Sequence, residues 1–162
     1  MRDRDFNATS FPLGAKKEGK SADLDALAAY VNSLTTVGVS PFRQANGQLS
    51  TAGAAGQQVF IAQGCAKCHS GDAFTDSATA TVHDIGTMND ASGSRLGGEL
   101  HGIDTPTLLG LWNTAPYLHN GSAPTLQEAV LAHDGVDEED FEANELLNLI
   151  QYLLQLDDSG GD

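Results

Sequence analysis

The sequence predicts an all-α fold with long loops, and three observations support this prediction. Apolar residues recur with a helical period near both ends of the chain, no segment shows the pattern of a convincing strand, and the middle of the chain has no sustained period. With 162 residues, of which 40% are hydrophobic, the chain has the length of one ordinary domain and enough apolar side chains for a core. No stretch approaches the roughly 18 apolar residues of a membrane-spanning helix.

The first expected helix lies near the N-terminus and carries one apolar stripe. This stripe consists of Leu24, Leu27, Ala28, Val31 and Leu34, with Tyr30 beside it. Ser21 is a suitable N-cap, and Gly38 and Pro41 end the helix. After a linker-like stretch at residues 40–50, a second helix is expected over residues 50–64.

The last expected helix repeats the pattern of the first. Its apolar residues Leu146, Leu149, Tyr152, Leu153 and Leu156 match Leu24, Leu27, Tyr30, Val31 and Leu34 at one constant offset. One interpretation is coincidence, because few residue types fill a buried helical stripe. The other interpretation makes residues 1–45 an N-terminal extension that holds the last helix of a preceding related domain, and residues 46–162 the domain proper.

A third helix is expected between these two, where Thr125 and Glu128 have the spacing of a capping box. We expect this helix to run to His133, with Gly135 ending it. The acidic residues 137–140 should then begin the last helix, because negative charge favours the positive end of a helix dipole.

The segment before the third helix, residues 70–105, is rich in Gly, Asp, Ser and Thr and has no helical or strand period. A loop of this length is unusual in a compact domain unless it binds or wraps something. The composition of this segment therefore suggests that the domain is built around a non-protein group.

The chain is strongly acidic, with 22 Asp and Glu against 8 Lys and Arg and a formal net charge of −14. No Lys or Arg follows Arg95, whereas most of the acidic residues do. Such a surface repels phosphate backbones, which excludes nucleic acid as a partner. It would attract a basic protein, although a solvated acidic face without a specific partner is the simpler interpretation.

Both cysteines of the chain lie in one motif, Cys65-Ala66-Lys67-Cys68-His69. This spacing is typical of covalent haem, in which two thioethers hold the haem vinyl groups and the adjacent imidazole binds the iron. A zinc site would need a second pair of ligands, a thioredoxin-like redox pair would need a βαβ frame, and a disulfide would leave the histidine unused. The motif therefore predicts one covalent haem c with His69 as its proximal ligand.

Several segments around this motif resemble one haem domain of the bacterial dihaem cytochrome c peroxidase and MauG family. They are residues 74–76 (FTD), 83–87 (HDIGT), 104–112 (DTPTLLGLW), 114–122 (TAPYLHNGS) and 124–130 (PTLQEAV). The resemblance spans residues 50–156, and the match is to the C-terminal, electron-transferring domain of the family. It implies a cytochrome c-like helical fold around one covalent haem, with long loops.

The resemblance also implies a position for the sixth iron ligand, which is occupied here by His133. The family has Met there in peroxidases and Tyr in MauG-like enzymes, so His is a departure. An imidazole binds ferric haem well and lowers the reduction potential relative to Met. Met88 is the rival ligand, because Met is the usual partner in small c-type cytochromes, and His83 is a weaker rival. The alternative interpretation of His133 is a histidine that merely stabilises a helix C-terminus.

Other positions carry weaker implications from the same resemblance. Thr114 and Pro116 match residues whose carbonyl groups hold a calcium ion between two haem domains, with a third ligand from the other domain. Trp112 is either an electron route at the haem edge or a core residue. His119 would hydrogen-bond a haem propionate or a backbone group.

These features predict single-electron transfer by a monohaem c-type domain, excised from a larger exported redox protein, with no catalytic residues of its own. The expected partners are a redox protein, favoured if basic, and other domains of the parent protein. The alternatives are a peroxidase or MauG-like oxidase, which needs a second haem domain, and a haem-containing structural or ligand-sensing module. Haem attachment to this motif takes place outside the cytoplasm, so a periplasmic or extracellular location is expected, with the export signal upstream of residues 1–6.

Overall fold

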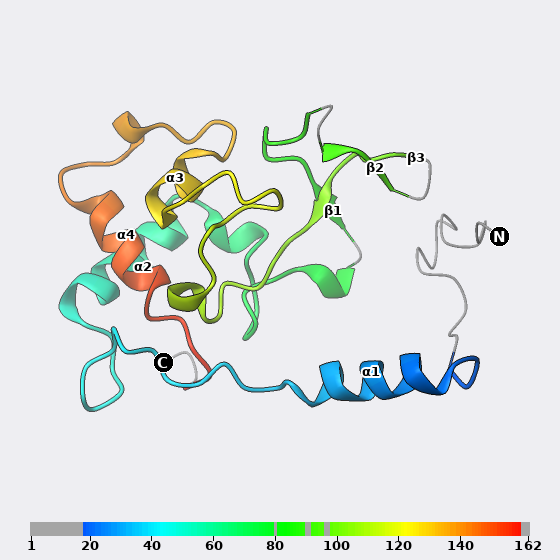
Figure 1. Ribbon diagram of the computed structural model, residues 1–162. Helices are drawn as coiled ribbons and strands as arrows, with labels where there is room; N and C mark the ends of the chain where they lie inside the picture. The colour runs from blue at the N-terminus through cyan, green and yellow to red at the C-terminus, as the bar shows by residue number, and fades with distance from the viewer. Residues whose placement is uncertain (1–17, 80, 90–91, 96–97, 160–162) are drawn as a thin grey trace. The chain divides into compact units, whose positions relative to one another are not determined.

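The computed structural model describes residues 18–79, 81–89, 92–95 and 98–159 (Figure 1). The chain divides into two compact units, each considered by itself below. Unit 1 comprises Met1–Thr36 and Gly93–Leu100, and unit 2 comprises Val37–Ser92 and His101–Asp162. Among the described residues, no helix has both the length and the apolar character needed to cross a membrane.

Unit 1 contains helix α1 (Ala22–Ser33) and a ladder of two short antiparallel strands, β2 (Ser94–Arg95) and β3 (Gly98–Glu99). The hydroxyl of Ser21 accepts a hydrogen bond from the backbone N–H of Leu24 at 3.4 Å, which confirms the predicted N-cap. No residue of α1 is buried, and its apolar stripe is exposed, with Leu24 at 65% and Leu27 at 56%. This helix therefore forms where the sequence predicts it, without burying its apolar face.

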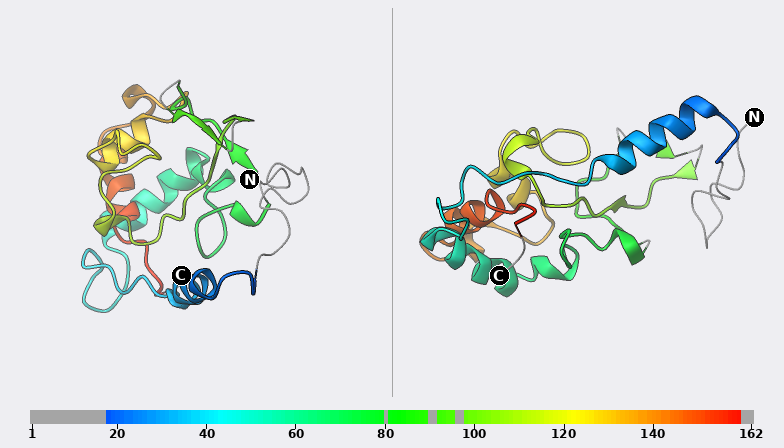
Figure 2. Two further views of the ribbon diagram at one scale, coloured as in Figure 1. Left: turned by 45° about the vertical axis from the view of Figure 1, so that its right-hand side comes forward. Right: turned by 90° about the horizontal axis from the view of Figure 1, so that it is seen from below.

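Unit 2 is organised by two helices, α2 (Thr51–Ala62) and α4 (Glu145–Leu153). They lie side by side in all three views (Figures 1 and 2). The hydroxyl of Ser50 caps α2 by accepting a hydrogen bond from the N–H of Gly53 at 3.0 Å. The core comprises Val59, Phe60, Leu126, Leu149, Tyr152, Leu153 and Leu156. The stripe predicted for the last helix is therefore the main contribution of that helix to the core.

Two glycines of α2 allow the close approach of the C-terminal segment. A Cβ atom at Gly56 would lie 1.9 Å from the carbonyl oxygen of Asn148, and one at Gly53 would lie 2.7 Å from the side-chain nitrogen of Gln155. Gln155 is fully buried, and its side-chain oxygen accepts a hydrogen bond from the N–H of Ser50 at 2.7 Å. The two glycines thus allow α2 and α4 to lie close together. The buried side-chain amide of Gln155 connects the start of α2 to the C-terminal segment by a hydrogen bond.

A buried ion pair fixes the linker-like residues 40–50 to the C-terminal end of the core. Arg43 Nε lies 3.0 Å from Asp157 Oδ1, and both side chains are almost fully buried. Burial raises the pKa of Asp157, but hydrogen bonds from Ser40 and Ser159 and the charge of Arg43 together bring this pKa below its usual value. The carboxylate therefore stays ionised, as a partner of a buried guanidinium must.

The third helix, α3 (Leu126–Leu131), has the predicted capping box. Thr125 Oγ1 accepts a hydrogen bond from the N–H of Glu128 at 3.2 Å, and Glu128 Oε2 accepts one from the N–H of Thr125 at 2.9 Å. The predicted extension of this helix to His133 is wrong, because α3 ends at Leu131. His133 instead lies in the turn that follows, where its N–H donates to the Val130 carbonyl at 3.3 Å.

The prediction that acidic residues 137–140 begin the last helix is also wrong. Residues 138–140 form a separate 3-10 turn, in which Asp140 Oδ2 accepts a hydrogen bond from the N–H of Asp137 at 2.8 Å. This reciprocal capping closes the turn on itself, and Phe141 is extended. Helix α4 begins only at Glu145.

The prediction that the middle of the chain contains no strand is also wrong. In unit 2, β1 (Val82–His83) pairs antiparallel with β4 (Ile103–Asp104), and unit 1 holds the β2–β3 ladder. Each of these strands has two residues, which is too short for an alternating pattern to be visible in the sequence. The described fold is therefore mostly helical with two short ladders in the long central segment, rather than purely all-α.

Candidate haem site

The Cys65–His69 motif follows α2 directly and forms the turn after it. Gly64 adopts a left-handed conformation with φ of 76°, and Cys65–Lys67 form one 3-10 turn. Both thiols are free, and Cys65 packs against the core, where burial raises its pKa. Helix α2, which buries one face in the core, therefore presents the motif at the edge of the core, with His69 at the end of the motif.

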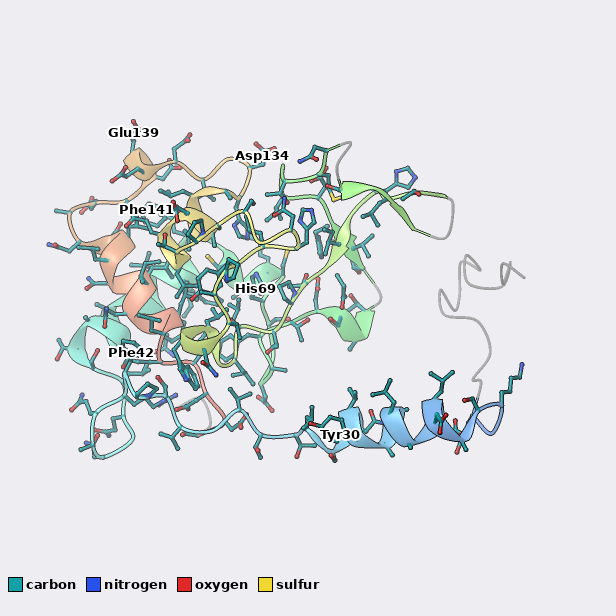
Figure 3. All side chains as sticks on the ribbon, viewed as in Figure 1. Tyr30, Phe42, His69, Asp134, Glu139 and Phe141 are labelled. Atoms are coloured by element: carbon teal, nitrogen blue, oxygen red, sulfur yellow. The ribbon has the colours of Figure 1, made fainter. Side chains whose placement is uncertain are left out.

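His69 lies beside two backbone carbonyl groups, those of Phe74 and Pro106. Its Nδ1–H donates a hydrogen bond to the carbonyl oxygen of Phe74 at 3.2 Å, and the ring is half-buried among surrounding side chains (Figure 3). Burial lowers the pKa of His69 more than the Phe74 carbonyl raises it, and the charge of His133 lowers it further. Because a carbonyl oxygen only accepts, the neutral ring carries its proton on Nδ1 and leaves the Nε2 lone pair available.

His133 is held in the same way, although it comes from a distant part of the chain. Its Nδ1–H donates to the carbonyl oxygen of Ala129 at 2.9 Å, so Nε2 of this half-buried ring also keeps its lone pair. The electrostatic effect of His133 on the pKa of His69 means that the two imidazoles lie within interaction range. This shared arrangement of backbone acceptors was not predicted, because no sequence pattern indicates which carbonyl a histidine will meet.

The two rival ligands lie in different surroundings. His83 has both ring nitrogens beside other groups, since Nε2 lies 2.7 Å from Asp76 Oδ2 and Nδ1 lies 4.0 Å from Cys68 Sγ. Met88 is half-buried in the segment after β1, and its N–H donates to Asp84 Oδ1 at 3.4 Å.

Cys68, Asp76 and His83 form a cluster that sequence reasoning missed. One ligand atom from each lies within 4.8 Å of the others. A hydrogen bond with the Thr105 side chain, and then one with His83, lower the pKa of Asp76. Asp76 enters the sequence analysis only through the family resemblance and His83 also as a rival iron ligand, and the spacing between them does not indicate that they touch.

Half-buried apolar side chains pack against the core and extend it. They include Leu49, Phe74, Leu108, Leu109, Leu111, Tyr117, Val130, Phe141, Ile150 and Leu154. Two imidazoles with available Nε2 lone pairs, two free thiols and an adjoining apolar core are the groups that a c-type haem requires. The residues present therefore fit this cofactor.

The positions with weaker implications lie nearer the surface. Thr114 and Pro116 are exposed, and Trp112 is half-buried in the 3-10 turn Leu111–Asn113. His119 Nε2 lies 3.2 Å from Ser92 Oγ.

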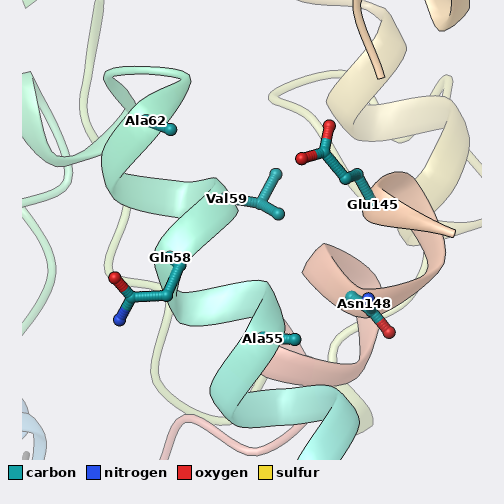
Figure 4. Close-up of a pocket in the computed structure, with 6 residues that line it drawn as sticks. All are labelled: Ala55, Gln58, Val59, Ala62, Glu145 and Asn148. Carbon is teal, nitrogen blue, oxygen red and sulfur yellow. The ribbon is translucent and has the colours of Figure 1, made fainter. Parts of the chain in front are cut away.

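A groove between α2 and α4 has a different character from the haem site (Figure 4). It has a volume of about 360 Å³ and is lined by Ala55, Gln58, Val59, Ala62, Glu145 and Asn148. No histidine or cysteine lines it, so it offers no group for haem attachment or iron binding.

The mostly helical fold and this donor set are those expected of a cytochrome c-like domain. A family described as RoxA-like, cytochrome c-like matches residues 102–134, which include His133. The chain is 29% identical over 174 residues to the gamma subunit of hydrazine synthase from Kuenenia stuttgartiensis, a match that covers 82% of this chain and 48% of that subunit.

Two solved structures are similar to this chain in fold. Hydrazine synthase from Kuenenia stuttgartiensis, pressurised with xenon, aligns with a TM-score of 0.63 and 27% identity over 82% of this chain and 55% of that chain. A MauG-like protein associated with microbial copper homeostasis shares the fold, with a TM-score of 0.57 and 21% identity over 93% of this chain and 62% of that one. The chain thus resembles MauG-like cytochromes, as its sequence predicts, and spans about half the length of its hydrazine synthase relative.

Proposed function

We propose that this chain is a c-type cytochrome domain that holds one covalent haem and transfers single electrons. The proposal rests above all on the matched pair of histidines. His69 and His133 are both half-buried, each ring is fixed through Nδ1 to a backbone carbonyl, and each keeps the Nε2 lone pair that iron needs. Similarity to cytochrome c-like proteins supports a redox role based on haem.

In this proposal each residue of the site has one role. Cys65 and Cys68 form the thioethers, His69 is the proximal ligand and His133 the distal ligand. His83 is less suited to iron because both of its nitrogens lie beside other groups, whereas Met88 stays the alternative distal ligand. Bound haem supplies the one-electron redox chemistry, while the chain orients the ligands and excludes water.

Spectroscopy of the purified haem protein tests this assignment. Two imidazole ligands make the ferric iron six-coordinate and low-spin, so we expect low-spin absorption and paramagnetic-resonance spectra that hydrogen peroxide leaves unchanged. A five-coordinate, high-spin ferric iron that turns over peroxide would support the peroxidase alternative. A five-coordinate iron that binds carbon monoxide without peroxide turnover would support a ligand-sensing module.

We also propose that α1 is the last helix of a preceding haem domain of the same type. Five positions along α1 and its C-cap Leu34 match five positions along α4 and the turn that follows it, which holds Leu156. The matching residues of the α4 segment are at most 7% exposed, whereas Tyr30 and Leu34 are each 62% exposed. A pattern that is buried in one helix and exposed in the other fits a helix that is separated from its packing partner. The chain also spans only about half the length of its hydrazine synthase relative, which leaves room for a second domain in the parent protein.

Matched substitutions at equivalent positions test this second proposal. In the present chain, Leu149→Ala should lower the free energy of unfolding by about 2–5 kcal/mol, because it leaves a cavity in the core. Leu27→Ala should change it by less than about 0.5 kcal/mol, because Leu27 is exposed. A longer chain that includes the residues encoded upstream of residue 1 provides the comparison. In that chain, Leu27→Ala should lower the free energy of unfolding by as much as Leu149→Ala. A gene without a haem domain before α1, or a neutral Leu27→Ala in the extended chain, contradicts the proposal.

We further propose that the domain works outside the cytoplasm with a basic redox protein as its partner. The acidic side chains of the 3-10 turn at 138–140 are exposed, and Glu139 lies at the periphery of unit 2 (Figure 3). Charge of this kind accelerates encounter with an oppositely charged protein. Because the similar hydrazine synthase chain is a subunit, association with other proteins has support from the comparison.

A further inference from the structure

We propose that Asp84, Ile85 and Gly86 are positioning residues for the distal ligand, because they hold the turn that carries His133 against the β1–β4 ladder. This inference rests on the proposed function, since it concerns what keeps the imidazole of His133 in place for the iron. It adds to the site three residues that do not themselves bind the cofactor.

The turn that carries His133 has only local support of its own. Helix α3 has six residues, and His133 lies two residues beyond its end. Within the described part of the chain, the hydrogen bonds of His133 are all made to neighbouring residues, namely Ala129, Val130 and Val136. A short helix is marginally stable and frays at its ends, so these local bonds can open together. A contact from a distant part of the chain is therefore needed to keep the imidazole in one position.

That contact comes from the segment directly after β1. The N–H of Asp134, the residue next to His133, donates a hydrogen bond to the carbonyl oxygen of Ile85 at 2.8 Å. Figure 3 labels Asp134 on the segment between α3 and α4. Ile85 lies two residues beyond the end of β1, which is paired with β4. The hydrogen bond thus connects the turn of the distal ligand to a backbone that a ladder holds.

Gly86 allows this segment to approach the turn closely. Its φ of 83° is in the left-handed region, where side chains are strained. A Cβ atom at Gly86 would lie 3.0 Å from the Cβ and 3.7 Å from the Cα of Asp134. A larger residue would therefore press directly on the neighbour of His133.

Asp84 supports the conformation in which Gly86 makes this approach. Its Oδ1 accepts hydrogen bonds from the N–H of Gly86 at 2.9 Å and from the N–H of Met88 at 3.4 Å. A side-chain oxygen that accepts from an N–H two residues further on stabilises a tight turn. This role needs an acceptor oxygen but no charge, so asparagine should serve as well as aspartate.

Two measurements on purified haem protein test the proposal. The full chain and its variants are produced in a host that attaches haem to c-type cytochromes. Titration of the ferric protein with cyanide gives the affinity of an external ligand that must displace His133. Hydrogen–deuterium exchange of the peptide that contains residues 131–136 reports how firmly the turn is held, because local opening exposes its amides.

The variants separate contact with the turn from backbone strain. Gly86→Ala introduces both, and Asp84→Ala removes the supporting oxygen, whereas Asp84→Asn keeps it. The matched control is Gly47→Ala, because Gly47 has the same φ of 83° and an added Cβ there would have no atom within 4 Å.

We expect Gly86→Ala to bind cyanide on the order of tenfold more tightly than the wild type, since groups that orient a metal ligand typically contribute about 10–100-fold to metal affinity. Exchange in residues 131–136 should be faster in the same variant. Asp84→Ala should change both readouts in the same direction by less, and Asp84→Asn should restore them. Gly47→Ala should match the wild type in both, because its strain does not reach the turn.

Equal cyanide affinities in Gly86→Ala and Gly47→Ala would overturn the proposal, and so would unchanged exchange of residues 131–136 in Gly86→Ala. If Gly86→Ala does not accumulate as haem protein, the two Asp84 variants decide, and equal cyanide affinities in them would overturn it. Failure of the proposed function looks different. A five-coordinate wild-type iron, or a wild-type spectrum in His133→Ala, would remove both proposals, whereas the preceding results remove only this one.

Discussion

Replacing His133 with alanine is expected to convert the ferric iron of the purified protein from six-coordinate and low-spin to five-coordinate and high-spin. The thioethers of Cys65 and Cys68 do not depend on the distal side, so haem stays attached. The imidazole of His133 has its Nδ1–H on the Ala129 carbonyl, which leaves Nε2 as the ligand atom whose loss the spectrum reports. Paramagnetic resonance and absorption spectra give the spin state, and carbon monoxide binding to the reduced protein reports the opened position.

Two further variants decide what an unexpected result means. Met88→Leu removes the thioether of the rival ligand and should leave the wild-type spectrum unchanged. His101→Ala removes an exposed histidine and should also be silent. A His133→Ala protein with an unaltered low-spin spectrum would refute the assignment, and a loss of the sixth ligand in Met88→Leu would transfer it to Met88.

Replacing Gly56 with alanine is expected to lower the free energy of unfolding by about 3 kcal/mol or more, at the upper end of the range for overpacking. The added Cβ would lie 1.9 Å from the oxygen and 2.4 Å from the carbon of the Asn148 carbonyl group. These are backbone atoms of α4, so only a displacement of the helix relieves the clash. That displacement would move Leu149, which is 1% exposed, out of its packing. The roughly 1 kcal/mol that alanine gains over glycine within a helix is too small to compensate.

Denaturant unfolding, followed by circular dichroism and by haem absorbance, measures this effect. Ala54→Gly is the matched control, because Ala54 is an exposed residue of the same helix. It should cost only the difference in helix propensity, about 1 kcal/mol. If Gly56→Ala proves as stable as the wild type, then α2 and α4 do not approach each other as closely as described.

The helix starts could be predicted from the sequence because their signals are local. Ser21 and Thr125 each accept the N-cap hydrogen bond expected of them, and Ser50, where the second helix was expected to begin, caps α2. The start of α4 could not be predicted in the same way, because Asp137 and Asp140 cap each other and close a separate turn. Charge at a helix start and charge in a self-capped turn look alike in sequence, and only the later path of the chain distinguishes them.

The sequence predicts the candidate site as a set of residues but not as an arrangement. The spacing of the haem motif points to Cys65, Cys68 and His69, because attachment and iron binding need these residue types close together in the chain. The acceptors of the two imidazoles, Phe74 and Ala129, are backbone groups of no distinctive residue type, so their roles depend on the folded chain. The contact between Asp76 and His83 likewise depends on the pairing of β1 with β4 and on the position of Thr105.

The backbone anchoring of the two imidazoles also bears on the speed of electron transfer. A transfer is slowed when groups around the redox centre must reorient as its charge changes. Nδ1 of His69 lies 3.2 Å from the Phe74 carbonyl oxygen, and Nδ1 of His133 lies 2.9 Å from the Ala129 carbonyl oxygen. Neither ring can therefore rotate without breaking a hydrogen bond. In the proposed role, the ligands would therefore keep one orientation in both oxidation states, and the reorganisation energy of the protein would be small.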